Sequence, residues 1–191
     1  MCFATIRFVK SVIEANDKPK TNFPEIAFVG RSNVGKSSML NCLFKRRKLA
    51  KISSTPGKTR LINYYLMDDR VYLVDLPGYG YIKKIDQLSK NWQKLIESYL
   101  SQNKNLKVVF LLVDSRHDLM RNDLLMIEWL YHYKIPFVVV LTKRDKISNN
   151  QFNFRLGKIK KMIPQVAIIP FSAKSFLGRE EIWDVIKEVT N

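Results

Sequence analysis

Residues 28–38, FVGRSNVGKSS, place two glycines and a lysine with two following serines directly after an apolar run. The spacing Gly30-x-x-x-x-Gly35-Lys36-Ser37, between an expected strand and an expected helix, is typical of a loop that binds phosphate. The glycines let backbone N–H groups turn toward a β-phosphate, and the helix N-terminus adds partial positive charge. We expect Lys36 to reach the β- and γ-phosphates and Ser37 to offer its hydroxyl to Mg²⁺. Many classes of protein hold phosphate, so the loop alone leaves the class open.

A second motif, Asp75-Leu76-Pro77-Gly78, ends the next but one expected strand. Its position predicts that the Asp75 carboxylate emerges near the bound metal ion and that Gly78 lets a backbone N–H approach the γ-phosphate. An Asp followed by Pro-Gly at a strand end is also a common turn. The motif therefore supports a phosphate site only together with the first loop.

The segment Thr142-Lys143-Arg144-Asp145 follows another apolar strand and indicates which base is bound. Asp145 can accept hydrogen bonds from the ring N–H and the exocyclic amine of guanine, while the stem of Lys143 can lie along the purine. Adenine presents no amine at that place, so an adenine nucleotide would leave a polar group mispaired. After the following strand, Ser172-Ala173-Lys174 would supply a backbone N–H to guanine O6.

Alternating strands and helices must position these motifs. The expected strands are Ile26–Val29, Leu61–Met67, Val71–Val74, Lys107–Val113, Phe137–Leu141 and Val166–Pro170, with an additional edge strand at Thr5–Val12. The expected helices are Lys36–Phe44, Leu88–Ser101, Asp118–Tyr133, Asn150–Met162 and Arg179–Val189. The pattern predicts an α/β fold with a mostly parallel six-stranded sheet, an N-terminal edge strand, and helices on both faces.

The bulk properties are those of one globular domain. The length of 191 residues suits a single core, and no apolar run is long enough to span a bilayer. The N-terminus does not resemble a secretory signal, so we expect a cytoplasmic protein. Cys2 and Cys42 are too few and too poorly placed for a disulfide framework.

The charge is strongly basic, with 33 Lys and Arg residues against 17 Asp and Glu and a formal net charge of +16. Asp and Glu are absent from Ile26–Met67 and from Lys146–Arg179. The first acid-free stretch contains Arg31, Lys36, Lys45, Arg46, Arg47, Lys48, Lys51, Lys58 and Arg60. Such a distribution favours binding to a polyanion such as RNA, DNA or an acidic membrane surface, although a general lysine bias would give a similar composition.

The segments GRSNVGKSS, TPGKTR, DLPGYGY, TKRDK and FSAK together resemble the EngB (YihA/YsxC) family of bacterial GTP-binding proteins, among the Era/TrmE-like GTPases. The resemblance implies a single Ras-like domain over residues 23–191 after an N-terminal extension, residues 1–22. It also implies GTP or GDP and Mg²⁺ as ligands, and a role in assembling the large ribosomal subunit through its rRNA. Normal cell division and septation are further implied, and a monomer is expected.

The resemblance and the motifs together give a set of expected nucleotide-binding residues: Gly30, Arg31, Ser32, Asn33, Val34, Gly35, Lys36, Ser37, Ser38, Gly57, Lys58, Thr59, Arg60, Leu61, Asp75, Leu76, Pro77, Gly78, Thr142, Lys143, Arg144, Asp145, Phe171, Ser172 and Ala173. Within this set Lys36, Thr59 and Gly78 are expected to act in catalysis. Ser37 and Thr59 are the expected metal ligands. Thr59 could instead merely begin the strand that follows it.

Two positions depart from the general GTPase pattern. Thr142 replaces the usual Asn of the base-reading motif, which predicts modest nucleotide affinity, and the EngB family usually shares this change. Tyr79 stands where Ras-type enzymes carry a Gln that orients water, so intrinsic hydrolysis should be slow. Related GTPases with an Asn at the position of Asn33 use K⁺, which makes K⁺ a further candidate cofactor.

Three classes of function remain open on the sequence. The leading one is a GTP-dependent switch that docks on a ribosomal assembly intermediate, which the basic stretches favour. A second is a protein-binding switch at the division site without RNA contact. A third is a P-loop nucleotide kinase, but Asp145 and the lack of an arginine-rich lid argue against it.

Overall fold

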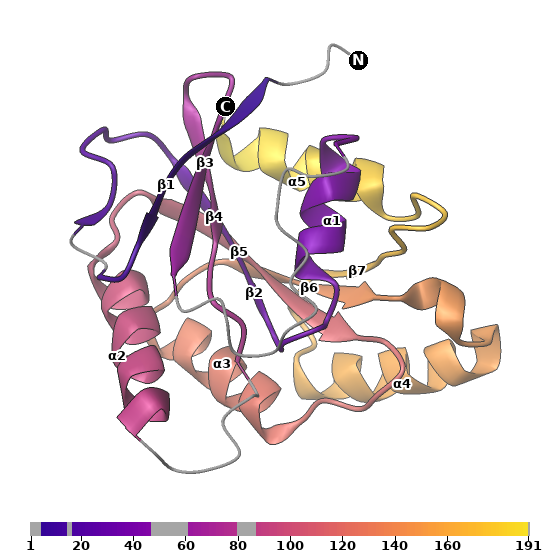
Figure 1. Ribbon diagram of the computed structural model, residues 1–191. Helices are drawn as coiled ribbons and strands as arrows, with labels where there is room; N and C mark the ends of the chain where they lie inside the picture. Colours follow the sequence, from indigo (N-terminus) through magenta and orange to yellow (C-terminus); the bar gives the residue numbers. More distant parts are fainter. Residues whose placement is uncertain (1–4, 15–16, 47–60, 80–86, 191) are drawn as a thin grey trace.

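Seven strands form one sheet in the order β1-β3-β4-β2-β5-β6-β7 in the computed structural model, which describes residues 5–14, 17–46, 61–79 and 87–190 (Figure 1). The strands are β1 (Ile6–Val12), β2 (Glu25–Gly30), β3 (Ile62–Met67), β4 (Val71–Asp75), β5 (Leu106–Asp114), β6 (Phe137–Thr142) and β7 (Ile168–Pro170). β4, β2, β5, β6 and β7 run parallel, while β3 and then β1 join antiparallel at one edge. This confirms the mostly parallel sheet and its N-terminal edge strand.

The central strands are buried on both sides, as near-continuous apolar runs predict. Every residue of β2 and β4 is buried. Phe28 of β2 and Phe110 of β5 are register partners whose rings stack with centroids 5.2 Å apart. A parallel core of this kind holds the strand ends, and hence the loops that follow them, in fixed positions.

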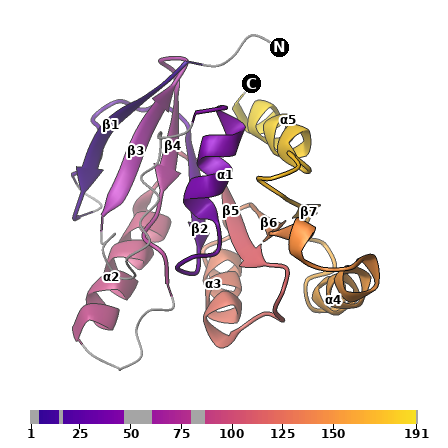
Figure 2. The ribbon, with the colours of Figure 1, turned by 45° about the vertical axis from the view of Figure 1, so that its right-hand side comes forward.

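Within the described ranges, five α-helices cover the two faces of the sheet (Figure 2). They are α1 (Lys36–Leu43), α2 (Gln87–Gln102), α3 (Arg121–His132), α4 (Asn149–Met162) and α5 (Arg179–Thr190). Buried residues of α1 and α5 share one apolar cluster with the sheet, and those of α2, α3 and α4 share the other. None of the described helices combines the length and apolar character needed to cross a membrane.

Two elements begin two or more residues later than the sequence predicts. α3 begins at Arg121 rather than Asp118, because the Asp123 carboxylate accepts the Met120 N–H at 2.8 Å and caps the helix there. β7 begins at Ile168 rather than Val166, because the Val166 N–H closes a turn on the Ile163 carbonyl at 3.2 Å. Both differences are local and leave the sheet order unchanged.

Candidate nucleotide-binding site

The loop between β2 and α1 joins its strand and helix through two glycines with different constraints. A Cβ on Gly30 would lie 2.7 Å from the Leu112 carbonyl oxygen of β5, so only glycine fits this approach of two backbones. Gly35 has a φ of 109° and precedes α1 without a side-chain cap. No acidic side chain lies in the first turn of α1, so its free amides suit an anion. The half-buried Ser37 and Ser38 follow in this first turn.

Lys36 and Asp75 form an ion pair at the junction of this loop with the end of β4. Their side chains are only 11% and 6% exposed. Asn63 of β3 donates its amide to the other Asp75 oxygen at 3.4 Å. The pair brings the expected phosphate-binding cation and the expected metal-side carboxylate together, and a phosphate would compete with Asp75 for the same ammonium.

The segment after Asp75 lies along the phosphate loop like a short extra strand. Leu76 donates its N–H to Phe28 at 3.0 Å, and Tyr79 donates its N–H to the Gly30 carbonyl at 3.1 Å. Ser32 in turn donates its N–H to the Tyr79 carbonyl at 2.8 Å. Gly78 therefore lies directly against residues 30–32, and the two loops expected to face the phosphates share one hydrogen-bonded frame.

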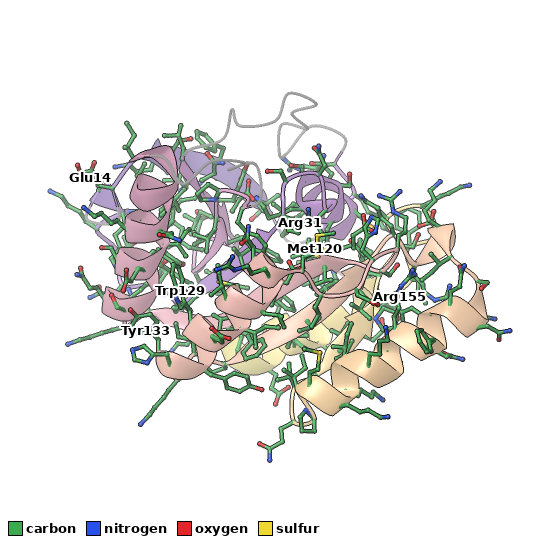
Figure 3. All side chains as sticks on the ribbon, turned by 90° about the horizontal axis from the view of Figure 1, so that it is seen from below. Glu14, Arg31, Met120, Trp129, Tyr133 and Arg155 are labelled. Atoms are coloured by element: carbon green, nitrogen blue, oxygen red, sulfur yellow. The ribbon has the colours of Figure 1, made fainter. Side chains whose placement is uncertain are left out.

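The Tyr79 side chain enters the core instead of the nucleotide side of the loop. It is 2% exposed and belongs to the apolar cluster of α2 and α3, and its hydroxyl donates to the Asp123 carboxylate at 2.8 Å. Burial raises the pKa of both groups, while the nearby Arg31 opposes the rise. Figure 3 shows Arg31 close to Met120 at the start of α3. The tyrosine thus anchors its loop to α3.

Thr142 and Lys143 connect the end of β6 to the phosphate loop. The Thr142 hydroxyl lies 2.7 Å from the Val34 carbonyl and 3.1 Å from that of Val113. Lys143, at a φ of 57°, donates its ammonium to the Asn33 carbonyl at 2.7 Å. Thr142 therefore bonds directly to the phosphate loop. The replacement of the usual Asn by Thr predicted only the loss of an amide contact and not this bond.

Asp114 completes this connection, although no motif in the sequence singled it out. Its carboxylate lies 2.8 Å from the Lys143 ammonium and 2.8 Å from the Arg116 guanidinium. Burial disfavours the charge, but the hydrogen bonds from Arg116 and Lys143 outweigh it and hold the pKa of Asp114 well below its usual value. The available signal was that β5, like β4, ends in an Asp.

Asp145 lies in a short 3-10 turn, Arg144–Lys146, beside the loop after β7. The Ser172 hydroxyl donates to its carboxylate at 2.8 Å and lowers its pKa, so the group is an ionised acceptor at neutral pH. Ser172 also accepts the Lys174 N–H at 3.2 Å. The structure thus places an acceptor from one motif next to the backbone of the other, as reading a guanine edge requires.

Other expected site residues have structural positions or lie outside the described part. Arg144 donates its N–H to the buried Phe171 at 3.1 Å, and its guanidinium lies over the Phe152 ring at 4.5 Å. The half-buried Ala173 follows in the loop, and Leu61 directly precedes β3. Outside the described residues lie Gly57, Lys58, Thr59 and Arg60, together with the basic Arg47, Lys48 and Lys51.

The solved structures that resemble this chain share its fold. The crystal structure of a probable GTP-binding protein engB has a TM-score of 0.65 and 28% identity, and the match covers 87% of this chain and 98% of that one. Aquifex aeolicus Era, solved with GDP·AlF4⁻, has a TM-score of 0.72 and 24% identity over 90% of this chain and 58% of its own. The Era likeness concerns the Ras-like fold alone.

Sequence comparisons identify the family. The family described as "50S ribosome-binding GTPase" matches residues 25–143. A "Probable GTP-binding protein EngB" of Kosmotoga olearia is 46% identical over 97% of this chain and 99% of its own length. A protein of the same name from Clostridium perfringens is 48% identical over 94% of this chain and 92% of its own. The chain therefore belongs to the EngB family of GTP-binding proteins.

Proposed function

We propose that this GTP-binding protein is a slowly hydrolysing switch that acts in assembly of the large ribosomal subunit. The observation that carries the nucleotide part is the meeting of three motifs at the carboxyl ends of parallel strands: the loop 30–38 after β2, Asp75 at the end of β4, and Asp145 beside Ser172. Ligands of open α/β sheets bind at this edge.

The phosphates would lie against the first turn of α1, where amides and the Lys36 ammonium face the same region. Lys36 would then exchange its bond to Asp75 for bonds to phosphate oxygens. The released Asp75 carboxylate and the Ser37 hydroxyl are hard oxygen ligands that suit Mg²⁺, and the ion would neutralise phosphate charge. Thr59 remains a proposed third ligand.

The base would be read by Asp145, whose ionised carboxylate can accept two hydrogen bonds from guanine. The Lys143 ammonium is bonded to the Asn33 carbonyl and to the Asp114 carboxylate. These bonds would hold its aliphatic stem in place along the purine. We propose that these contacts select guanine over adenine.

Hydrolysis would be slow because no water-orienting amide stands at position 79. The Tyr79 hydroxyl is already engaged with the buried Asp123. A K⁺ ion near Asn33 would offer the missing positive charge, and comparing turnover in KCl and NaCl at equal ionic strength tests it. Equal rates in the two salts would contradict the K⁺ proposal.

The ribosomal part rests on charge and on kinship. The net charge of +16 favours a polyanionic partner, and the family description names 50S ribosome binding. We therefore propose a cytoplasmic monomer that binds the large subunit or its precursor, and we place the link to cell division and septation downstream of that role. Residues 1–22 are proposed as an extension whose strand β1 completes the sheet of the G domain, residues 23–191.

Sedimentation with purified large subunits, in GDP or a non-hydrolysable GTP analogue and at two salt concentrations, tests the proposal. We expect tighter binding with the GTP analogue and a steep loss of binding as salt rises, because phosphate contacts release counterions. Binding that ignores both salt and nucleotide would instead favour the protein-binding switch at the division site.

A further inference from the structure

α4 differs in charge from the other helices that flank the sheet. It carries Arg155, Lys158, Lys160 and Lys161 and contains no acidic residue. α5, on the opposite face, contains four acidic residues and two basic ones. Figure 2 shows α4 at the β6–β7 end of the sheet, on the outside of the molecule.

The exposed side of α4 combines an aromatic ring with ammonium groups. We call Phe154, Gly157, Lys158 and Lys161 the α4 face, because helical spacing places them on one side, opposite the buried Phe152 and Ile159. Phe154 is 66% exposed. A large aromatic side chain so open to water gains nothing from the core.

The acidic neighbour of this face is already neutralised. Asp118 lies 2.9 Å from the Lys158 ammonium and 3.8 Å from the Arg155 guanidinium. The Lys158 ammonium also lies 4.7 Å from the centre of the Phe154 ring. Lys160 and Lys161 have no carboxylate within 4.0 Å among the described residues, so they can meet an external anion.

Gly157 is a mid-helix glycine that the fold does not explain. A Cβ there would meet nothing within 4 Å, so alanine would fit and would stabilise the helix. The glycine lies one turn after Phe154 and one turn before Lys160 and Lys161. It leaves a gap on the α4 face through which a partner can approach the helix backbone.

We propose that the α4 face binds single-stranded RNA. A base would stack on Phe154, the phosphates would pair with Lys161, and the sugar-phosphate chain would cross at Gly157. The choice of RNA among polyanions rests on the proposed ribosomal function. A lipid surface fits less well, because the apolar side of α4 is buried in the core and a membrane-binding helix needs that side for the bilayer.

Fluorescence anisotropy with a labelled single-stranded RNA of about 12 nucleotides, and with a duplex of equal length, tests the proposal. Phe154→Ala should weaken single-strand binding at least about fivefold and duplex binding far less. Lys161→Ala should weaken the binding of both RNAs. It should also reduce the slope of log affinity against log salt concentration by about 0.7 for the single strand. Gly157→Ala should raise the melting temperature and yet weaken binding. Tyr131→Ala and Lys104→Ala, at exposed positions outside α4, are the matched controls and should bind like the unmodified protein.

The proposal is overturned if the three α4 variants, shown to be folded by circular dichroism, bind RNA like the controls. It is equally overturned if they lose binding to anionic vesicles while RNA binding stays unchanged. The outcome is separable from the ribosomal proposal. If the protein sediments with subunits in a nucleotide-dependent way but the α4 substitutions do not change RNA binding, only the α4 inference is removed. If RNA binding depends on Phe154 but the protein does not sediment with subunits, only the ribosomal role is removed.

Discussion

The buried bond between Tyr79 and Asp123 makes a quantitative prediction about stability. Tyr79→Phe removes one hydroxyl, which donates to the Asp123 carboxylate at 2.8 Å, and keeps the aromatic ring. A hydrogen bond to a charged group contributes about 1.5–3 kcal/mol. For a chain of this size each 1 kcal/mol moves the melting temperature by about 2–4 °C, so we expect a loss of roughly 3–12 °C.

Two further tyrosine variants control for the loss of a hydroxyl. Tyr133→Phe removes a hydroxyl that donates to Glu97 at the surface at 2.9 Å, and should leave the melting temperature nearly unchanged because water replaces the lost bond. The buried Tyr64 hydroxyl has no partner among the described residues, so Tyr64→Phe should be neutral or stabilising. The same chemical change is thus expected to destabilise the protein only at Tyr79.

Thermal unfolding followed by circular dichroism provides the measurement. The difference in melting temperature between Tyr79→Phe and the unmodified protein should narrow as the pH falls toward the pKa of Asp123, which burial raises above the ordinary carboxyl value, because the protonated carboxyl depends less on the bond. If Tyr79→Phe and Tyr133→Phe had the same melting temperature at every pH, the anchoring of this loop to α3 would be refuted.

Three other changes test the site. Gly30→Ala should destabilise the fold by about 1–3 kcal/mol in denaturant titration, because its Cβ meets the Leu112 backbone. Asp114→Asn should destabilise the protein most at neutral pH; the pKa of Asp114 is lowered by folding, so its contribution is present above the ordinary carboxyl pKa of about 3.9 and fades as pH falls below it. Ser37→Ala should weaken GTP binding in Mg²⁺ but not in EDTA, and equal losses in both would remove the metal role.

Much of the fold followed from the sequence because its strongest signals are local. The apolar runs of β2, β5 and β6 could form only buried strands, and the loop at Gly30 and Gly35 sits at a strand-to-helix junction that the pattern requires. Even the edge strand β1 was predicted, because branched and aromatic apolar residues recur over Thr5–Val12.

The contacts that pair distant residues were beyond the sequence. Asp123 looked like an ordinary helix residue, yet it both caps α3 and holds Tyr79, 44 positions away. Asp114 became a partner of Lys143 only through the parallel register of β5 and β6. Such pairs depend on which side chains the sheet brings together, and a single sequence does not encode that in any local pattern.

We propose that Asp145 reads the base, and competitive nucleotide titration of Asp145→Asn tests this role. The unmodified protein should prefer GDP and GTP over ATP by at least about a hundredfold. The variant should turn toward xanthine nucleotides, because its amide offers a donor to a base that has gained a carbonyl. Asp69→Asn, at an exposed carboxylate on the β3–β4 turn, should keep the guanine preference. Equal affinity of the unmodified protein for ATP and GTP, or a guanine preference that survives in Asp145→Asn, would contradict the account.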